Sequence, residues 1–264
     1  MTNQDKLHVL SKITSAVLEK EPFDHLIIDD FFPDDIANKL YSEFPDFDDE
    51  VWFNYKNKIE DKKLLTDWRK FPKYTYQAFS FLNSNVVLDT LRNMTNCQLY
   101  ADNGLHGGGW HIHANGGKLN PHLDYSLHPM LKQQRKLNLI VYLCKDWTES
   151  YGGHFGLWSQ DSTTKRSGNL VKEIPVGFNK AVLFDTTQDS WHGLSRIVSC
   201  PDNLFRKSLA VYYLTDPPQG VDERSRALFS PTEKQRDDAE IAELIEKRAD
   251  FNRSKEVYQQ NHKL

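Results

Sequence analysis

Apolar residues recur at helical spacing along the first third of the chain. Residues 6–20 place them three or four positions apart, which predicts a helix, and residues 33–44 and 76–93 predict two more. Pro33, followed by two aspartates, favours a helix start because proline fits the first turn and acidic side chains complement the helix dipole. Between the first two helices, residues 23–32 (FDHLIIDDFF) predict a strand and a turn.

The pattern changes after about residue 97. Short runs of β-branched and aromatic residues then alternate with clusters of Gly, Pro, Asn and Asp, and the clearest runs are residues 136–143, 152–159, 180–186 and 207–214. Several short strands separated by turn signals are typical of an antiparallel sandwich or barrel. The middle of the chain is therefore predicted to be a β-core.

Helical patterning returns towards the C-terminal end. Ser230 and Glu233 have the spacing of a capping box, and Pro231 fits the first helical position. No internal repeat or low-complexity linker divides the chain, so we predict one domain over residues 1–264, of the α+β class with a mainly β core. Its predicted parts are a helical N-terminal part (1–96), the β-core (about 97–216) and a C-terminal helical extension (about 230–262).

Composition and charge narrow the functional classes. Of the 264 residues, 39% are hydrophobic and 27% are charged, so a folded globular chain is expected. The net charge of −4 argues against a nucleic-acid partner, which requires a basic face. No apolar run is long enough for a bilayer and the first residues do not resemble a secretion signal, so no membrane partner is expected. Three widely spaced cysteines without a CxxC pair suit a reducing, cytoplasmic location.

The stretch KLNPHLDYS (118–126) contains the first candidate chemistry. His122 and Asp124 are two positions apart, so on a strand both side chains project from the same face. Such a pair alone is a weak signal, because a surface ion pair has the same pattern. His192 follows 68 residues after Asp124, near the end of a predicted strand. Two histidines and one carboxylate can form the facial triad of non-haem Fe(II) oxygenases, which leaves three metal positions open.

A second motif lies further downstream. Arg206 begins the strand RKSLAVYYL, and Ser208 shares its face. A guanidinium beside a hydroxyl suits a small carboxylate, because arginine offers a planar fork of donors. A 2-oxo acid could then bind the metal at one end and Arg206 at the other. Lys207 is the competing cation, but it is expected to point to the opposite face.

These motifs resemble the Fe(II)/2-oxoglutarate-dependent dioxygenases, in particular the prolyl-hydroxylase-like branch (prolyl 4-hydroxylase alpha-subunit-like). The similarity begins at PFDHLIIDDFFPDDIANKLYSEFP and continues through PHLDYSLHP, RKLNLIVYLCKDW, YGGHFGLW, FDTTQDSWHGL and RKSLAVYYLTD. It implies a double-stranded β-helix, or jelly roll, with helices packed on its outside.

The resemblance also implies a role for each motif residue. The metal ligands for Fe(II) would be His122, Asp124 and His192. Arg206 would bind the far carboxylate of 2-oxoglutarate, with Ser208 beside it and Tyr142 hydrogen-bonded to the same group. O2 would be the second cosubstrate, with ascorbate as a candidate reductant.

The resemblance leaves the substrate open. It implies hydroxylation of a prolyl residue in a peptide or protein, and a free amino acid or a sugar derivative is the alternative. Desaturation or ring closure at the same iron is a further possibility, and a non-catalytic jelly-roll binding module is another. The candidate substrate contacts are Tyr125, Asn115 and Trp158.

Two further features of the sequence have more than one interpretation. His111 and His113 could imitate a metal site, but they lack a third ligand, so we expect one buried, hydrogen-bonded histidine and one near the mouth of the site. Residues 49–65 are either a loop over that mouth or ordinary surface.

Overall fold

Two antiparallel sheets form the centre of the protein in this computed structural model, which describes residues 1–250 and 252–258. The larger sheet has nine strands; seven form a continuous path, β4 pairs with β13, and β6 pairs with β3. In order across the path these are β1 (His25–Ile28), β11 (Phe178–Asp185), β8 (Gln134–Leu143), β13 (Arg206–Thr215), β5 (Gly109–His113), β3 (Glu60–Leu65) and β2 (Phe53–Lys56), and the branches are β4 (Tyr100–Ala101) and β6 (Lys118–Leu119).

The smaller sheet faces the larger one and completes the double-stranded β-helix predicted from the resemblance. Its five strands, in order, are β10 (Ser167–Ile174), β9 (Phe155–Gln160), β12 (Trp191–Leu194), β7 (His122–Leu123) and β14 (Leu228–Phe229). The α+β class with a mainly β core is thereby confirmed. The four clearest predicted strands correspond to β8, β9, β11 and β13, because their apolar residues face buried surroundings on both sides.

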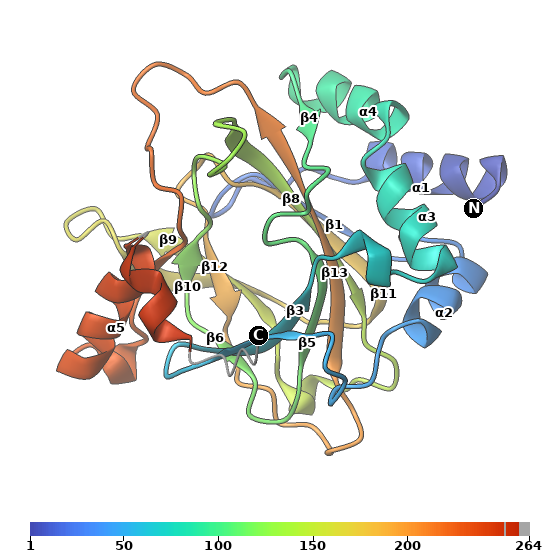
Figure 1. Cartoon of the computed structure of the whole chain (residues 1–264). Helices are drawn as coiled ribbons and strands as arrows, with labels where there is room; N and C mark the ends of the chain where they lie inside the picture. Colours follow the sequence, from blue (N-terminus) through green and yellow to red (C-terminus); the bar gives the residue numbers. More distant parts are fainter. Residues whose placement is uncertain (251, 259–264) are drawn as a thin grey trace.

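Four helices gather on one side of the larger sheet, as Figure 1 shows. They are α1 (Asn3–Ser15), α2 (Asp34–Ser42), α3 (Lys73–Leu82) and α4 (Asn85–Thr95). Their apolar faces join one hydrophobic core with the sheet; Ile13, Leu40 and Phe79, for example, are at most 1% exposed. This packing fixes the outer face of the sheet and leaves its inner face to the site.

The N-terminal part differs from the prediction in three places. The helix predicted over residues 76–93 is two helices, because the chain turns at Asn83 and Ser84. The helix predicted over residues 6–20 ends at Ser15. Residues 49–65 are neither an open loop nor plain surface: β2 and β3 form a hairpin that extends the larger sheet, so the part from 1 to 96 is not purely helical.

The C-terminal segment also corrects the sequence-based prediction. The capping box is formed by Thr232 and Gln235, not by Ser230 and Glu233, and it starts only the short 3-10 helix η3 (Glu233–Gln235). The longer helix α5 (Ala239–Ala249) begins after Asp238, whose carboxylate caps it. The 3-10 helix η4 (Arg253–Val257) follows, and the end of the predicted helix, residues 259–262, lies outside the described residues.

Helix α5 lies by the smaller sheet, away from the other four helices (Figure 1). Ile241 and Ile245 of this helix pack on Phe229 of β14 and on Ile59, which precedes β3. The C-terminal segment therefore bridges the two sheets at one end of the β-core. Within the described residues, no helix is both long and apolar enough to cross a bilayer.

Candidate active site

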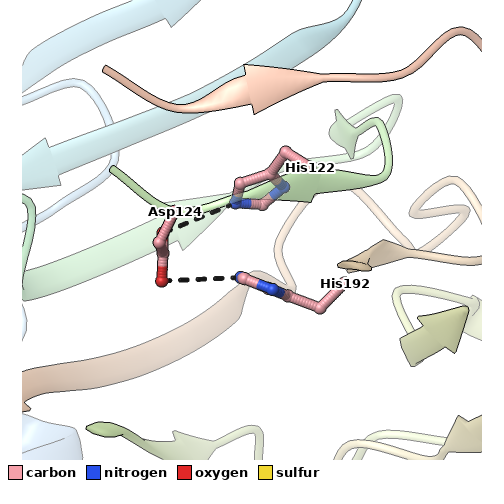
Figure 2. Close-up of side chains that lie close together, drawn as sticks. All are labelled: His122, Asp124 and His192. Carbon is pink, nitrogen blue, oxygen red and sulfur yellow. Dashed lines mark ion pairs between the residues drawn. The ribbon is translucent and has the colours of Figure 1, made fainter. Parts of the chain in front are cut away.

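The predicted metal-ligand trio comes together between the sheets. His122 on β7 lies directly opposite His192 on β12, and Asp124 follows immediately after β7. One oxygen of Asp124 is 3.8 Å from Nε2 of His122, and the other is 3.8 Å from Nε2 of His192. Figure 2 shows the three side chains pointing towards one another. They are the one group of at least three potential ligands found in the described part of the chain, and their ligand atoms lie within 4.8 Å of one another.

Backbone carbonyls fix the orientation of both imidazoles. The Nδ1–H of His122 donates to the carbonyl of Asn120 at 3.1 Å, and that of His192 donates to the carbonyl of Ser190 at 2.8 Å. A carbonyl oxygen can only accept, so Nδ1 carries the proton on each ring and the lone pair lies on Nε2. Metal-binding histidines in proteins are held in this way. The two Nε2 atoms are therefore prepared as ligands.

The protonation of the three groups also suits a metal ion. Burial lowers the pKa of both imidazoles, so each is neutral and able to bind a cation. Burial opposes the charge on Asp124, but the positive charge of the Arg135 guanidinium is the largest opposing influence, and the pKa of this carboxyl is held at about 2. The site thus offers two neutral nitrogens and one carboxylate, a donor set typical of non-haem Fe(II).

Arg135, which the sequence analysis missed, holds Asp124 in place. Its Nη1 is 3.2 Å from one oxygen of Asp124, and Asn138 donates to the other at 3.2 Å. The guanidinium is stacked between the rings of Tyr125 and Tyr212, with its carbon 3.4 and 3.3 Å from the ring centroids. Both faces of the guanidinium are thus covered. This packing fixes the N–H donors of Arg135 and therefore the carboxylate of Asp124 that they bind.

The predicted carboxylate anchor assembles on the larger sheet. Ser208 of β13 lies directly opposite Tyr142 of β8. Arg206 precedes Ser208 by two positions and shares its face of the strand. The guanidinium carbon of Arg206 is 4.8 Å from the ring centroid of Tyr142. All three side chains are at most 3% exposed. Lys207 points away from the cavity, with its ammonium 4.3 Å from the Tyr41 ring centroid, so Arg206 is the cation of this pair that faces the site.

Gly153 lets the chain approach Arg206 closely. Its carbonyl accepts a hydrogen bond of 2.7 Å from Nε of Arg206. The residue has φ of +68°, and an added Cβ would lie 2.8 Å from Cδ of Arg206. Only glycine suits both conditions. Because Nε is occupied, the terminal nitrogens of Arg206 form the part of the fork that remains for a carboxylate.

The Tyr142 hydroxyl can donate a hydrogen bond to a carboxylate bound at Arg206. The hydroxyl is buried, and its proton has no acceptor among the described residues, because the neighbouring Arg206 guanidinium can only donate to the hydroxyl oxygen. Burial raises its pKa to about 12, so it keeps that proton. A buried donor without an acceptor costs free energy, and a carboxylate bound at Arg206 would satisfy it. The residues present therefore fit both Fe(II) and 2-oxoglutarate.

A cavity of about 170 Å³ connects the metal-ligand trio with the carboxylate anchor. Tyr125 lines this cavity, although its ring also supports Arg135. Asn115 lies in an exposed turn and Trp158 covers Gly156 on β9, and neither lines the cavity. Any contact of these two residues with a substrate would have to be made outside the cavity, and their role stays a prediction.

The cavity wall also contains charged and polar residues that the sequence analysis did not assign. They are Glu60, Lys62, His111, His113, Arg135, Asn138, Arg226 and Arg248. On β5, the His111 ring has a backbone hydrogen bond at Gly107, whereas both ring nitrogens of the buried His113 lack partners among the described residues, so a buried and satisfied histidine is not found at position 113. The two-residue spacing on a strand was the signal that both face one cavity.

Comparisons with known proteins agree with this geometry. Residues 108–217 match the 2OG-Fe(II) oxygenase superfamily. A curated relative, prolyl 3-hydroxylase OGFOD1 of Xenopus laevis, is 30% identical over 92 residues, which make up 33% of this chain and 17% of that protein. The chain thus matches about a sixth of this relative's length.

Two solved structures share the fold. A prolyl 4-hydroxylase from Phytophthora capsici has a TM-score of 0.54 at 19% identity and covers 94% of this chain and 77% of its own. A prolyl-4-hydroxylase from Pseudomonas putida has a TM-score of 0.50 at 16% identity, over 80% of this chain and 98% of its own. The matched residues 108–217 include every metal-ligand and anchor residue predicted above. Residues 108–217 are therefore similar to the 2OG-Fe(II) oxygenase superfamily, and His122, Asp124 and His192 lie in a fold shared with these two prolyl 4-hydroxylase structures.

Proposed function

We propose that this protein is a 2-oxoglutarate-dependent dioxygenase that hydroxylates a prolyl residue of a peptide or protein. One observation carries the proposal: the converging ligand atoms of His122, Asp124 and His192 share a cavity with the Arg206 anchor. The prolyl substrate is supported by the similarity to prolyl 3-hydroxylase OGFOD1.

The metal ligands in this proposal are His122, Asp124 and His192. Bound Fe(II), with 2-oxoglutarate and O2, supplies the oxidising chemistry that forms succinate and CO2 and places a hydroxyl group on an unactivated carbon. The chain's own work is to hold the reactants at fixed positions. Arg135 and Asn138 keep the carboxylate of Asp124 turned towards the two imidazoles, which preserves the open side of the site.

The cosubstrate is oriented by the opposite wall. The terminal nitrogens of Arg206 would bind its far carboxylate, and the Tyr142 hydroxyl would donate a hydrogen bond to the same group. Ser208, which is paired with Tyr142 and lies two positions from Arg206 on the same strand, offers a further hydroxyl donor. Because these side chains are buried, water is excluded from the carboxylate, and the hydrogen bonds are stronger than they would be in solution. The open end of the cosubstrate is thereby directed towards the metal ligands.

Turnover with candidate peptides tests the reaction. The protein would be incubated with Fe(II), 2-oxoglutarate, ascorbate and proline-containing peptides, and succinate and peptide mass would be measured together. Succinate matched by the gain of one oxygen on proline is the expected result. A loss of two hydrogens would indicate desaturation or ring closure instead, and a non-catalytic binding module would form no succinate in excess of an Asp124→Ala control.

We also propose a cytoplasmic location and a single domain. All three cysteines are free in the structure, which supports a reducing compartment. The helices at both ends of the chain pack on the same pair of sheets, which supports one cooperative unit. Fractionation of source cells and thermal unfolding test these points; recovery in a secreted fraction, or two separate unfolding transitions, would contradict them.

A further inference from the structure

Lys62 occupies an unassigned place on the cavity wall. On β3, Leu64 lies opposite His111 of β5 and Lys63 opposite Ile112, so Lys62 follows opposite His113. His113 in turn lies opposite Arg206 of β13. Three neighbouring strands thus carry a lysine, a histidine and an arginine in one row, and all three side chains line the cavity. Two strand spacings, about 10 Å, separate the ends of this row.

The ammonium group of Lys62 has no anionic partner among the described residues. The ammonium lies over the face of the Tyr55 ring, 5.3 Å from the centroid. Glu60 shares its face of β3, but this carboxylate is bound by Nε of Arg248 at 3.0 Å and by the Tyr258 hydroxyl. Burial lowers the pKa of Lys62, and Glu60 only partly opposes this effect. The half-buried lysine therefore lacks the paired anion that a desolvated cation normally has.

The charge of the described lining points in the same direction. Apart from Arg226, it contains four cationic side chains and two acidic ones, although the chain as a whole has a net charge of −4. The two acidic groups are already paired, Asp124 with Arg135 and Glu60 with Arg248. Fe(II) and the 2-oxoglutarate dianion bring equal and opposite charges. These described residues would keep an excess of two positive charges, which attracts anions.

Two neutral imidazoles lie beside Lys62 and add hydrogen-bonding capacity. Burial lowers the pKa of His111 to about 3 and that of His113 well below its usual value, so both rings are uncharged. Both ring nitrogens of His113 are buried without partners in the described part of the chain. The proton of the His111 ring is directed to the backbone at Gly107, so its buried Nε2 is an acceptor. A neutral imidazole can donate one hydrogen bond to an oxygen anion. The row thus combines one cation with one unused donor, on His113.

We propose that Lys62, assisted by His113, binds an anionic group of the substrate. The substrate class is therefore an anionic one, in which a carboxylate or phosphate lies near the carbon that is hydroxylated. This inference rests on the proposed function, because it reserves Arg206 and Tyr142 for 2-oxoglutarate. For a peptide substrate, it places an acidic or phosphorylated residue beside the modified one.

Anion binding to the loaded protein tests the proposal without a known substrate. Protein saturated anaerobically with Fe(II) and 2-oxoglutarate would be titrated with inorganic phosphate, and separately with acetate, by calorimetry. We expect saturable binding of one anion per chain, weakened at least about tenfold in Lys62→Met and largely kept in Lys62→Arg. The probe that binds more tightly indicates a phosphate or a carboxylate on the substrate. Lys56→Met, on the exposed part of the same hairpin, is the matched control and should bind like the wild type.

The visible band of the Fe(II)–2-oxoglutarate complex separates the possible failures. If Lys62→Met forms this band normally but binds both anions as the wild type does, the inference is wrong and the proposed function stands. The same conclusion follows if the wild type forms the band but binds neither anion. If Lys62→Met weakens 2-oxoglutarate itself, Lys62 serves the cosubstrate and the inference is overturned. A wild type without the band overturns the proposed function and the inference together.

Discussion

The two walls of the cavity differ in how far their polar groups are already hydrogen-bonded. On the smaller sheet, both metal-facing histidines already donate their Nδ1 protons to backbone carbonyls, and Asp124 is bound on both oxygens. On the larger sheet, the Tyr142 hydroxyl proton and the ring nitrogens of His113 have no partners among the described residues. The first wall is fixed before any ligand arrives, whereas the second is completed by ligands. Substitutions on the two walls should therefore fail in different ways.

Removing a metal ligand should have the largest effect. His192→Ala removes one of two imidazoles and should abolish both iron retention and succinate formation, because two ligands no longer define one face of the metal. The buried ring is replaced without leaving an unpaired charge, so folding should survive. Iron content after gel filtration and succinate yield measure the effect. A variant that keeps stoichiometric iron and normal turnover would remove His192 from the site.

Arg206→Met should act on the cosubstrate and leave iron binding intact. The loss of charge-assisted hydrogen bonds to a carboxylate should raise the KM for 2-oxoglutarate by about 100-fold. Arg206→Lys should recover only part of this loss, because an ammonium cannot reproduce the planar fork. Initial rates over a range of 2-oxoglutarate concentrations provide the measurement. An unchanged KM would exclude Arg206 as the anchor.

Arg135→Met tests whether the support of Asp124 by Arg135 is needed for iron binding. It should lower iron affinity by about 10- to 100-fold, the range seen when groups that orient metal ligands are removed. It should also lower the free energy of unfolding of the metal-free protein by about 3–5 kcal/mol, because Asp124 becomes a buried charge without its partner. Iron titration and denaturant unfolding measure the two effects. Asp124→Asn in the same background should recover stability but not iron binding; a destabilised double variant would contradict this explanation.

Tyr142→Phe should have the smallest effect of the four. It removes one neutral hydrogen bond to the 2-oxoglutarate carboxylate and should raise the KM about 2- to 10-fold. The metal-free protein should be as stable as the wild type or more so, since the proton of the deleted hydroxyl has no acceptor there. Thermal unfolding with and without 2-oxoglutarate separates the two states. A loss of stability in the metal-free protein would show that the hydroxyl has a structural role.

The sequence was sufficient where neighbouring residues decide the outcome. The strand runs at β8, β11 and β13 are strongly apolar, and the i and i+2 spacing of His122 and Asp124 fixes their common face. The order of the motifs along the chain then identified His192 as the third ligand and Arg206 as the carboxylate anchor. The fold class and the residues that meet in the site were predictable for these reasons.

The residues that were missed depend on the pairing of distant strands. Lys62 lies in the polar run KNKIEDKKLL, which shows no clear alternation, and only the register of β3 on β5 brings it to the cavity. Arg135 was missed because its contact with Asp124 crosses from β8 to the end of β7, and its other partner, Tyr212, is far away along the chain. Long-range register decides such contacts, and local patterns do not contain it.

An anaerobic titration of the metal-free protein with Fe(II) and 2-oxoglutarate is the decisive measurement. We expect a visible charge-transfer band in the wild type, no band in His192→Ala, and a band that requires far more 2-oxoglutarate in Arg206→Met. Folded wild-type protein that forms no band at saturating concentrations of both would contradict the assembly of the iron and 2-oxoglutarate sites described above.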